Sequence, residues 1–320
     1  MTGSYEIVVS NVKVRYEFTI RRNITVVKGD SATGKTTLVE MIREHYEAGV
    51  SSGIDLKCEK TCRVLAGRDW NVLLGAMHDS IIFIDEDNEF LPTDDFARAV
   101  RESDNYYVIV SREGLANLPY SVEEIYGIRE SGKYASMKRV YNEFYHIYGN
   151  TEIRKTICPE RVIVEDSNSG YEFFKGISEK KDYTVTSANG KSNIFAQVMN
   201  CPDRNVLVIA DGAAFGAEMD RMMKLALRKK GVALYLPESF EWLLLKSGVV
   251  TDRSMDSVLA SPENWIESRV YFSWERFFTA LLSKVTKDTY LRYSKRKLNE
   301  VYLHENIASE IVRQITGAEL

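Results

Sequence analysis

The feature that most constrains the fold of this chain is an eight-residue segment between a run of β-branched residues and a helical pattern. Residues 29–36 read Gly-Asp-Ser-Ala-Thr-Gly-Lys-Thr and match the pattern G-x-x-x-x-G-K-[ST] at every fixed position. The two glycines let the backbone turn so that successive N–H groups point inward at a phosphate, and the N-terminus of the following helix adds positive potential. The segment therefore predicts a strand, a phosphate-binding loop and a helix, in that order.

The residues of this loop, together with a few others, are expected to contact a bound nucleotide. We expect Lys35 to reach the β- and γ-phosphate oxygens and to take part in catalysis, and the Thr36 hydroxyl to bind Mg²⁺. A flexible glycine loop before a helix is the alternative interpretation. The complete set expected to bind the cofactor, ATP, is Gly29, Asp30, Ser31, Ala32, Thr33, Gly34, Lys35, Thr36, Thr37, Ser111 and Arg112.

A second motif is the apolar run of residues 81–84, Ile-Ile-Phe-Ile, which is directly followed by Asp85 and Glu86. Such a run is typical of a strand buried on both faces. Asp85 is expected to hold Mg²⁺ through water, and Glu86 to polarise the attacking water as general base. The run and its two acids resemble a Walker B motif. A buried strand that merely ends in acids is the alternative.

The order of these patterns predicts the fold class. Strand-like apolar runs alternate with helical spacing, which is typical of a parallel α/β sheet. The strands before residue 29 resemble the start of ABC-type and related (AAA-type) ATPase domains, although no L-S-G-G-Q-like signature occurs. The resemblance implies a P-loop NTPase, with Ser111 and Arg112 at the place of a polar sensor; pairing of Arg112 with an acid is the alternative. Because no N-K-x-D motif is present, ATP is favoured over GTP, and a phosphotransferase stays open.

Two further carboxylates follow strand-like runs in the second half of the chain. Glu165 comes after residues 162–164 and Asp211 after residues 206–210. Because ligands of open α/β sheets bind outside the carboxyl ends of the strands, we expect the two side chains to converge. The order resembles the TOPRIM domain of topoisomerases, primases and overcoming-lysogenization-defect (OLD) nucleases, where a glutamate and a later D-x-D bind Mg²⁺. The resemblance implies that Glu165 and Asp211 are metal ligands.

This chain departs from the D-x-D pattern at Ala213, which stands where the second aspartate is expected. Glu218, Asp220 or Asp166 could substitute for the missing ligand. A degenerate fold that is kept for binding is one alternative, and acids at strand ends without a shared site are another.

The length, composition and charge of the chain indicate how many domains it has and which kinds of partner it can bind. The 320 residues, 44% hydrophobic and 28% charged, suit a globular chain of two domains. The net charge of −4 gives no global cationic field, so nucleic acid would have to contact local basic clusters at residues 228–230 and 295–297. Solvated helix faces are the alternative for both clusters. No apolar run reaches the roughly 20 residues that a bilayer requires, so we expect no membrane partner.

The four cysteines, without a signal-like start, favour the reducing cytoplasm and predict no disulfides. Cys58 and Cys62 could form a zinc site with His45 and His78, but buried thiols are the alternative interpretation.

We therefore expect an α/β protein with three parts: a P-loop NTPase domain with a parallel sheet over residues 1–148, a smaller TOPRIM-like α/β domain over 160–248, and a helical C-terminal region over 249–320. The expected function is ATP binding with slow Mg²⁺-dependent hydrolysis, which controls a domain that binds or processes nucleic acid. A nucleotide-gated protein-interaction module is the alternative, and an oligomer or a protein partner stays open.

Overall fold

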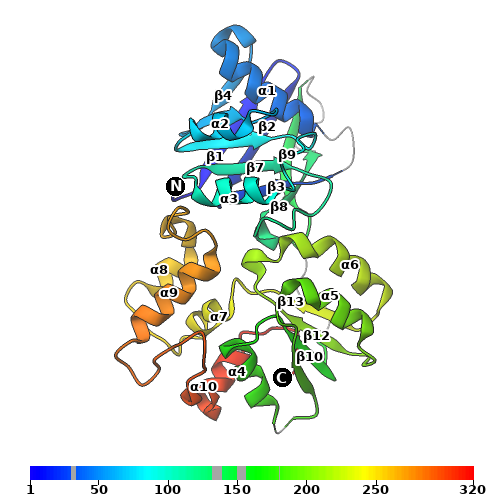
Figure 1. The fold of residues 1–320 in the computed structure, drawn as a ribbon, viewed down its shortest axis with the longest axis vertical. Helices are drawn as coiled ribbons and strands as arrows, with labels where there is room; N and C mark the ends of the chain where they lie inside the picture. Colours follow the sequence, from blue (N-terminus) through cyan, green and yellow to red (C-terminus); the bar gives the residue numbers. More distant parts are fainter. Residues whose placement is uncertain (30–33, 132–138, 150–155, 180) are drawn as a thin grey trace. The chain divides into compact units, whose positions relative to one another are not determined.

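The computed structural model describes residues 1–29, 34–131, 139–149, 156–179 and 181–320. The chain divides into two compact units (Figure 1). The first unit is Met1–Ile147 together with Ser261–Phe272, and the second is Tyr148–Ala260 together with Ser273–Leu320. The residues after 248, expected as one helical region, are thus divided between the two units, and the chain passes from one unit to the other three times.

The first unit contains a nine-stranded sheet in the order β4-β1-β2-β9-β8-β3-β7-β6-β5. Its strands are β1 (Tyr5–Ser10), β2 (Val14–Ile20), β3 (Ile24–Val27), β4 (Asp55–Lys57), β5 (Thr61–Val64), β6 (Ser80–Ile84), β7 (Tyr106–Val110), β8 (Ile125–Glu130) and β9 (Val140–His146). The helices are α1 (Lys35–Ala48), α2 (Trp70–Gly75) and α3 (Asp94–Glu102). The unit is therefore mixed α/β, as the sequence predicts.

The prediction of a wholly parallel sheet is wrong for this unit. Strands β5, β6, β7, β3 and β8 run parallel, whereas β1 pairs antiparallel with β2 and with β4, and β8 pairs antiparallel with β9. The physical reason is connection length: the few residues between β1 and β2 can join only antiparallel neighbours, because a parallel crossover needs a dozen residues or more.

Strands β4 and β5 lie at opposite ends of the nine-stranded order, yet only residues 58–60 separate them in the chain. Four residue steps span at most about 14 Å, whereas the ends of nine flat strands would be about 38 Å apart. The sheet must therefore curl until its two edges approach each other. Helix α1 contacts strands from both edges, and its Leu38, Met41 and Ile42 belong to the same buried cluster as Ile7 and Phe83.

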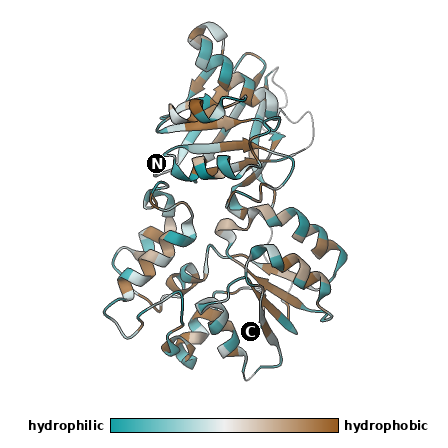
Figure 2. Ribbon diagram, viewed as in Figure 1, coloured by the Kyte–Doolittle hydropathy of each residue, from teal (hydrophilic) through white to brown (hydrophobic). Residues whose placement is uncertain are grey.

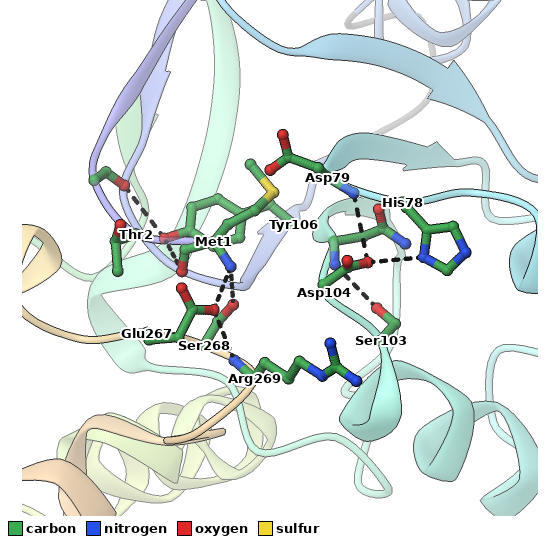
Figure 3. A network of polar contacts seen from close by, with 12 residues as sticks. Met1, Thr2, His78, Asp79, Ser103, Asp104, Tyr106, Glu267, Ser268 and Arg269 are labelled. Atoms are coloured by element: carbon green, nitrogen blue, oxygen red, sulfur yellow. Dashed lines mark hydrogen bonds and ion pairs between the residues drawn. The ribbon is translucent and has the colours of Figure 1, made fainter.

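The segment Ser261–Phe272 joins the first unit at strand β1 and the residues before it. The amino group of Met1 donates to Glu267 Oε1 at 2.5 Å and to Ser268 Oγ at 3.1 Å, as Figure 3 shows. Gly3 N donates to Glu263 O at 2.7 Å. This attachment explains why twelve residues of the late chain belong to the first unit.

The second unit contains a four-stranded, wholly parallel sheet in the order β11-β10-β12-β13. The strands are β10 (Arg161–Val164), β11 (Thr184–Ser187), β12 (Val206–Ile209) and β13 (Val232–Tyr235). The helices are α4 (Ser169–Ser178), α5 (Lys191–Asn200), α6 (Met219–Arg228), α7 (Phe240–Lys246), α8 (Met255–Ala260), α9 (Trp274–Thr286) and α10 (Glu305–Val312). The βα repetition predicted here is confirmed, and Figure 2 shows hydrophobic residues concentrated on its central strands. None of the helices in the described part of the chain has the length and apolar character needed to cross a bilayer.

Candidate functional site

In the first unit, three strand ends lie at one edge of the sheet. Strand β7 lies between β3 and β6, and all three run parallel. Val27 is in register with Val110, and Ile84 with Ile109, so the strands end at nearly the same level. The residues that follow these ends are the start of the predicted phosphate loop, Ser111 with Arg112, and Asp85 with Glu86. The fold thus places the three predicted groups at the carboxyl edge, where open α/β sheets bind ligands.

The predicted phosphate loop is described at its two ends, Gly29 and Gly34; Asp30, Ser31, Ala32 and Thr33 lie outside the described residues. Gly34 has a φ of +83°, which favours glycine. A Cβ at this position would lie only 2.5 Å from the hydroxyl oxygen of Tyr16, which donates a hydrogen bond to Gly34 O at 2.8 Å. Position 34 therefore requires glycine for two independent reasons, backbone conformation and the close approach of Tyr16.

Lys35 begins helix α1, and its side chain turns back to the loop. Its Nζ donates to Gly29 O at 2.7 Å, and the residue is only 5% exposed. Thr36 and Thr37 follow on the first turn of α1 and are exposed. The ammonium is thus held at the base of the loop, and the two threonine hydroxyls are accessible.

The second predicted group contains a strong ion pair. Arg112 Nε donates to both carboxylate oxygens of Glu86 at 3.0 Å, and its Nη2 lies 2.7 Å from Oε1. The pairing of Arg112 with an acid, one of the two interpretations of its sequence, is what the structure contains. Asp85 Oδ1 accepts a hydrogen bond from Glu86 N at 2.8 Å, and the buried Ser111 donates to Glu113 O. Bidentate Arg–carboxylate pairs fix both partners in orientation, so Arg112 determines where the Glu86 carboxylate points.

In the second unit, Glu165 and Asp211 come together as expected. Their strands β10 and β12 are adjacent, with Val164 in register with Ile209. Asp211 N donates to Glu165 Oε2 at 3.0 Å. The two carboxylates therefore share one edge of the parallel sheet.

The structure adds to this edge an ion-pair network that the sequence reasoning missed. Lys295 Nζ donates to Glu275 Oε1 at 2.6 Å and lies 3.3 Å from Glu241 Oε1. The Tyr293 hydroxyl donates to the same Glu241 oxygen at 2.7 Å. These residues come from α7, from α9 and from the segment after α9, so no local pattern links them to Glu165. The one feature of the sequence that pointed to this network was the position of Lys295 in the basic cluster of residues 295–297.

The electrostatics of these carboxylates follow from burial and crowding. Burial, together with the negative charge of Glu275, raises the pKa of Glu165 to about 7, although the Asp211 amide and Lys191 oppose the shift. Burial also raises the pKa of Asp211 well above its ordinary value, to which Glu275 and Glu165 add. Burial and crowding therefore favour the protonated forms of the two acids, and a divalent cation bound there would displace protons.

The three acids proposed to replace the ligand missing at Ala213 are engaged elsewhere. Glu218 pairs with Arg221, and Asp220 accepts from the Tyr148 hydroxyl. Asp166 accepts from the amides of residues 167, 168 and 170. Among the described residues, no three or more His, Cys, Asp or Glu side chains are grouped so that they could hold a metal ion.

The residues of the possible zinc site and of the two basic clusters make separate local contacts. His45 Nδ1 contacts Ile54 O and His78 Nδ1 contacts Asp104, so neither histidine joins Cys58 and Cys62 in a zinc site. In the basic clusters, Lys229 donates to the carbonyl oxygens of Val198 and Cys201, and Lys295 pairs with glutamates. The exposed members of the two clusters are Arg228, Lys230, Arg296 and Lys297.

No family model, no curated protein and no solved structure matches this chain.

Proposed function

We propose that the first unit binds ATP with Mg²⁺ and hydrolyses it slowly, and that the nucleotide controls the second unit, whose acidic edge binds or processes nucleic acid. The proposal includes the finer fold assignments, a P-loop NTPase for the first unit and a TOPRIM-like domain for the second. Its main support is one observation: β3, β6 and β7 end in register, so the loop glycines and Lys35 share an edge with Asp85, Glu86 and Arg112.

The residues at this edge fit a nucleoside triphosphate. Gly34 has a positive φ, which lets the backbone turn at the end of the loop as the binding of a phosphate by backbone amides requires. Lys35 would balance phosphate charge, and Thr36 and Asp85 would hold Mg²⁺, which neutralises charge on the phosphates and aligns them for attack by water. Glu86 would orient that water and accept its proton. Because Arg112 holds both Glu86 oxygens, the base must leave this pair before it acts, and this requirement supports slow turnover.

Replacing Lys35 with alanine is the first test of the nucleotide site. We expect the ATP affinity to fall at least tenfold, about 1.4 kcal/mol, because the ammonium group at the base of the loop is lost. Alanine favours the helical conformation, so α1 should still form. Calorimetric titration of ATP and Mg²⁺ measures the change. Lys57→Ala, which removes an exposed lysine from β4, is the matched control and should bind as the wild type does. Equal affinity in all three proteins would refute the nucleotide site.

A nucleotide-gated interaction module without nucleic-acid activity is the second candidate. It is favoured by the second unit itself, where Ala213 replaces a ligand and Lys295 already contributes a positive charge among the carboxylates. Two carboxylates bind a single Mg²⁺ only weakly.

Incubation with DNA separates the two candidates. If the second unit processes nucleic acid, the protein should nick supercoiled DNA weakly in Mg²⁺ or Mn²⁺, and the nicking should depend on ATP. The substitutions Glu165→Ala and Asp211→Ala should abolish it. Arg228→Ala should leave the chemistry intact. A salt-dependent gel shift without cleavage would still support nucleic-acid binding. Neither cleavage nor a shift at low salt, on single-stranded and double-stranded DNA alike, would favour the interaction module.

A further inference from the structure

We propose that Cys58 and Cys62 form a peroxide-oxidised dithiol site, in which Cys58 is the attacking thiol and Cys62 the resolving one. The two cysteines flank the short connection between β4 and β5, at the place where the edges of the curled sheet approach each other. Both contact the same residue: Lys60 N donates to Cys58 Sγ at 3.4 Å, and Cys62 Sγ lies 3.8 Å from Lys60 O. The chain bends at residues 59 and 60, and the two thiols are close enough for a side-chain hydrogen bond between them.

The two thiols differ in the way that such a pair requires. Cys58 is partly exposed, whereas Cys62 is 3% exposed within the core. A hydrogen bond from the Cys62 thiol lowers the pKa of Cys58 to about 7, against the effect of burial and of the nearby Glu59 carboxylate. The same hydrogen bond and burial raise the pKa of Cys62. Cys58 is therefore the thiolate that solvent can reach, and the thiolate is the reactive form.

The expected reaction balances with one peroxide. The Cys58 thiolate attacks one oxygen of hydrogen peroxide, the O–O bond breaks, and the departing hydroxide takes a proton to become water, leaving a sulfenic acid. The Cys62 sulfur, after loss of its proton to solvent, attacks the Cys58 sulfur, and the sulfenic hydroxyl leaves as a second water. The two thiols are oxidised by two electrons in total, and the peroxide is reduced to water.

We expect oxidation of the two cysteines to loosen the packing of helix α1. Cys62 belongs to the buried cluster that also contains Leu38, Met41 and Ile42 of α1, and Cys58 packs against the edge of this cluster. A disulfide requires the sulfurs to lie about 2.05 Å apart, so its formation should disturb the packing of the cluster that Cys62 shares with the helix. The amides of α1, which begins at Lys35, should then exchange with solvent faster.

The test is oxidation of the full chain by dilute hydrogen peroxide, followed by peptide mapping. We expect a 58–62 disulfide, reversed by dithiothreitol, that forms at least tenfold faster than any oxidation of Cys158. Cys158 is the internal control, because it is exposed but its pKa is raised by a hydrogen bond to Glu319. In Cys62→Ala a sulfenic acid should form on Cys58 more slowly, because the hydrogen bond that lowers its pKa is lost, but it should persist without a resolving thiol and be trapped by dimedone; Cys58→Ser should form neither product.

Hydrogen–deuterium exchange tests the consequence for α1. Exchange in residues 35–48 should rise in the oxidised wild type and stay unchanged in peroxide-treated Cys58→Ser. Oxidation of Cys58 no faster than that of Cys158, or overoxidation of Cys58 with Cys62 still a thiol, would overturn the dithiol site. A disulfide without any change in α1 would overturn the coupling to the helix. Neither measurement uses nucleotide, so both remain decisive if the proposed ATP binding fails.

Discussion

Replacing Glu86 with glutamine is expected to leave ATP binding nearly unchanged and to lower turnover by about 10²–10⁴-fold, the usual contribution of a positioned general base. Glutamine keeps the size of the side chain and one oxygen that can accept a hydrogen bond from Arg112, so the strand end keeps its shape. It cannot take a proton from water. Phosphate release under saturating ATP measures turnover, and calorimetry measures binding in the same preparations.

Two neighbouring variants serve as controls for this result. Asp87→Asn changes an exposed acid one residue further along and should leave turnover as in the wild type. Asp85→Ala should instead weaken the Mg²⁺-dependent binding itself, because its expected role is to hold the ion. Unchanged phosphate release in Glu86→Gln would place the base elsewhere or favour a switch that binds ATP without hydrolysis.

The edge formed by the ends of β3, β6 and β7 was predictable because its signals are local. The strand, the glycine loop and helix α1 occupy consecutive residues 24–48, and residues 81–84 and 106–110 are apolar, as strands buried on both faces are. Neighbouring parallel strands end at the same edge of a sheet, so the proximity of Glu165 and Asp211 could be predicted from the sequence alone. The choice between the two interpretations of Arg112 depended on a side-chain direction, which the sequence could not supply.

Other features depend on contacts between distant parts of the chain. The nine-stranded order depends on the pairing of β2 with β9, whose paired residues lie more than a hundred positions apart. Glu241, Glu275 and Lys295 are brought to one place by the packing of α7 with α9, and helical periodicity identifies a buried face but not its partner. The return of residues 261–272 to the first unit likewise has no local signal, because it depends on contacts with distant residues that include Met1, Gly3 and Asn23.

Replacing Lys295 with methionine is expected to destabilise the second unit by about 2 kcal/mol. Glu241 is 1% exposed, and its Oε2 has no hydrogen-bond partner among the described residues. Although burial opposes the charge on Lys295, Glu241 and Glu275 raise its pKa above the ordinary value, so the lysine is charged and balances both. Loss of one partner of a fully buried pair costs about 3–5 kcal/mol. We expect less here because the Lys295 side chain is 34% exposed and water screens part of the interaction.

A double-mutant cycle distinguishes lost charge balance from lost packing. Methionine keeps most of the aliphatic length of lysine, so the packing of the side-chain stem is largely retained. If uncompensated charge on Glu241 is the cause, adding Glu241→Gln to Lys295→Met should restore part of the urea-unfolding free energy, because a neutral amide needs no balancing cation. Lys297→Met, an exposed neighbour, should change stability by less than about 0.5 kcal/mol. If the two substitutions are simply additive, the two side chains are not coupled, and the loss of stability in Lys295→Met does not come from uncompensated charge on Glu241.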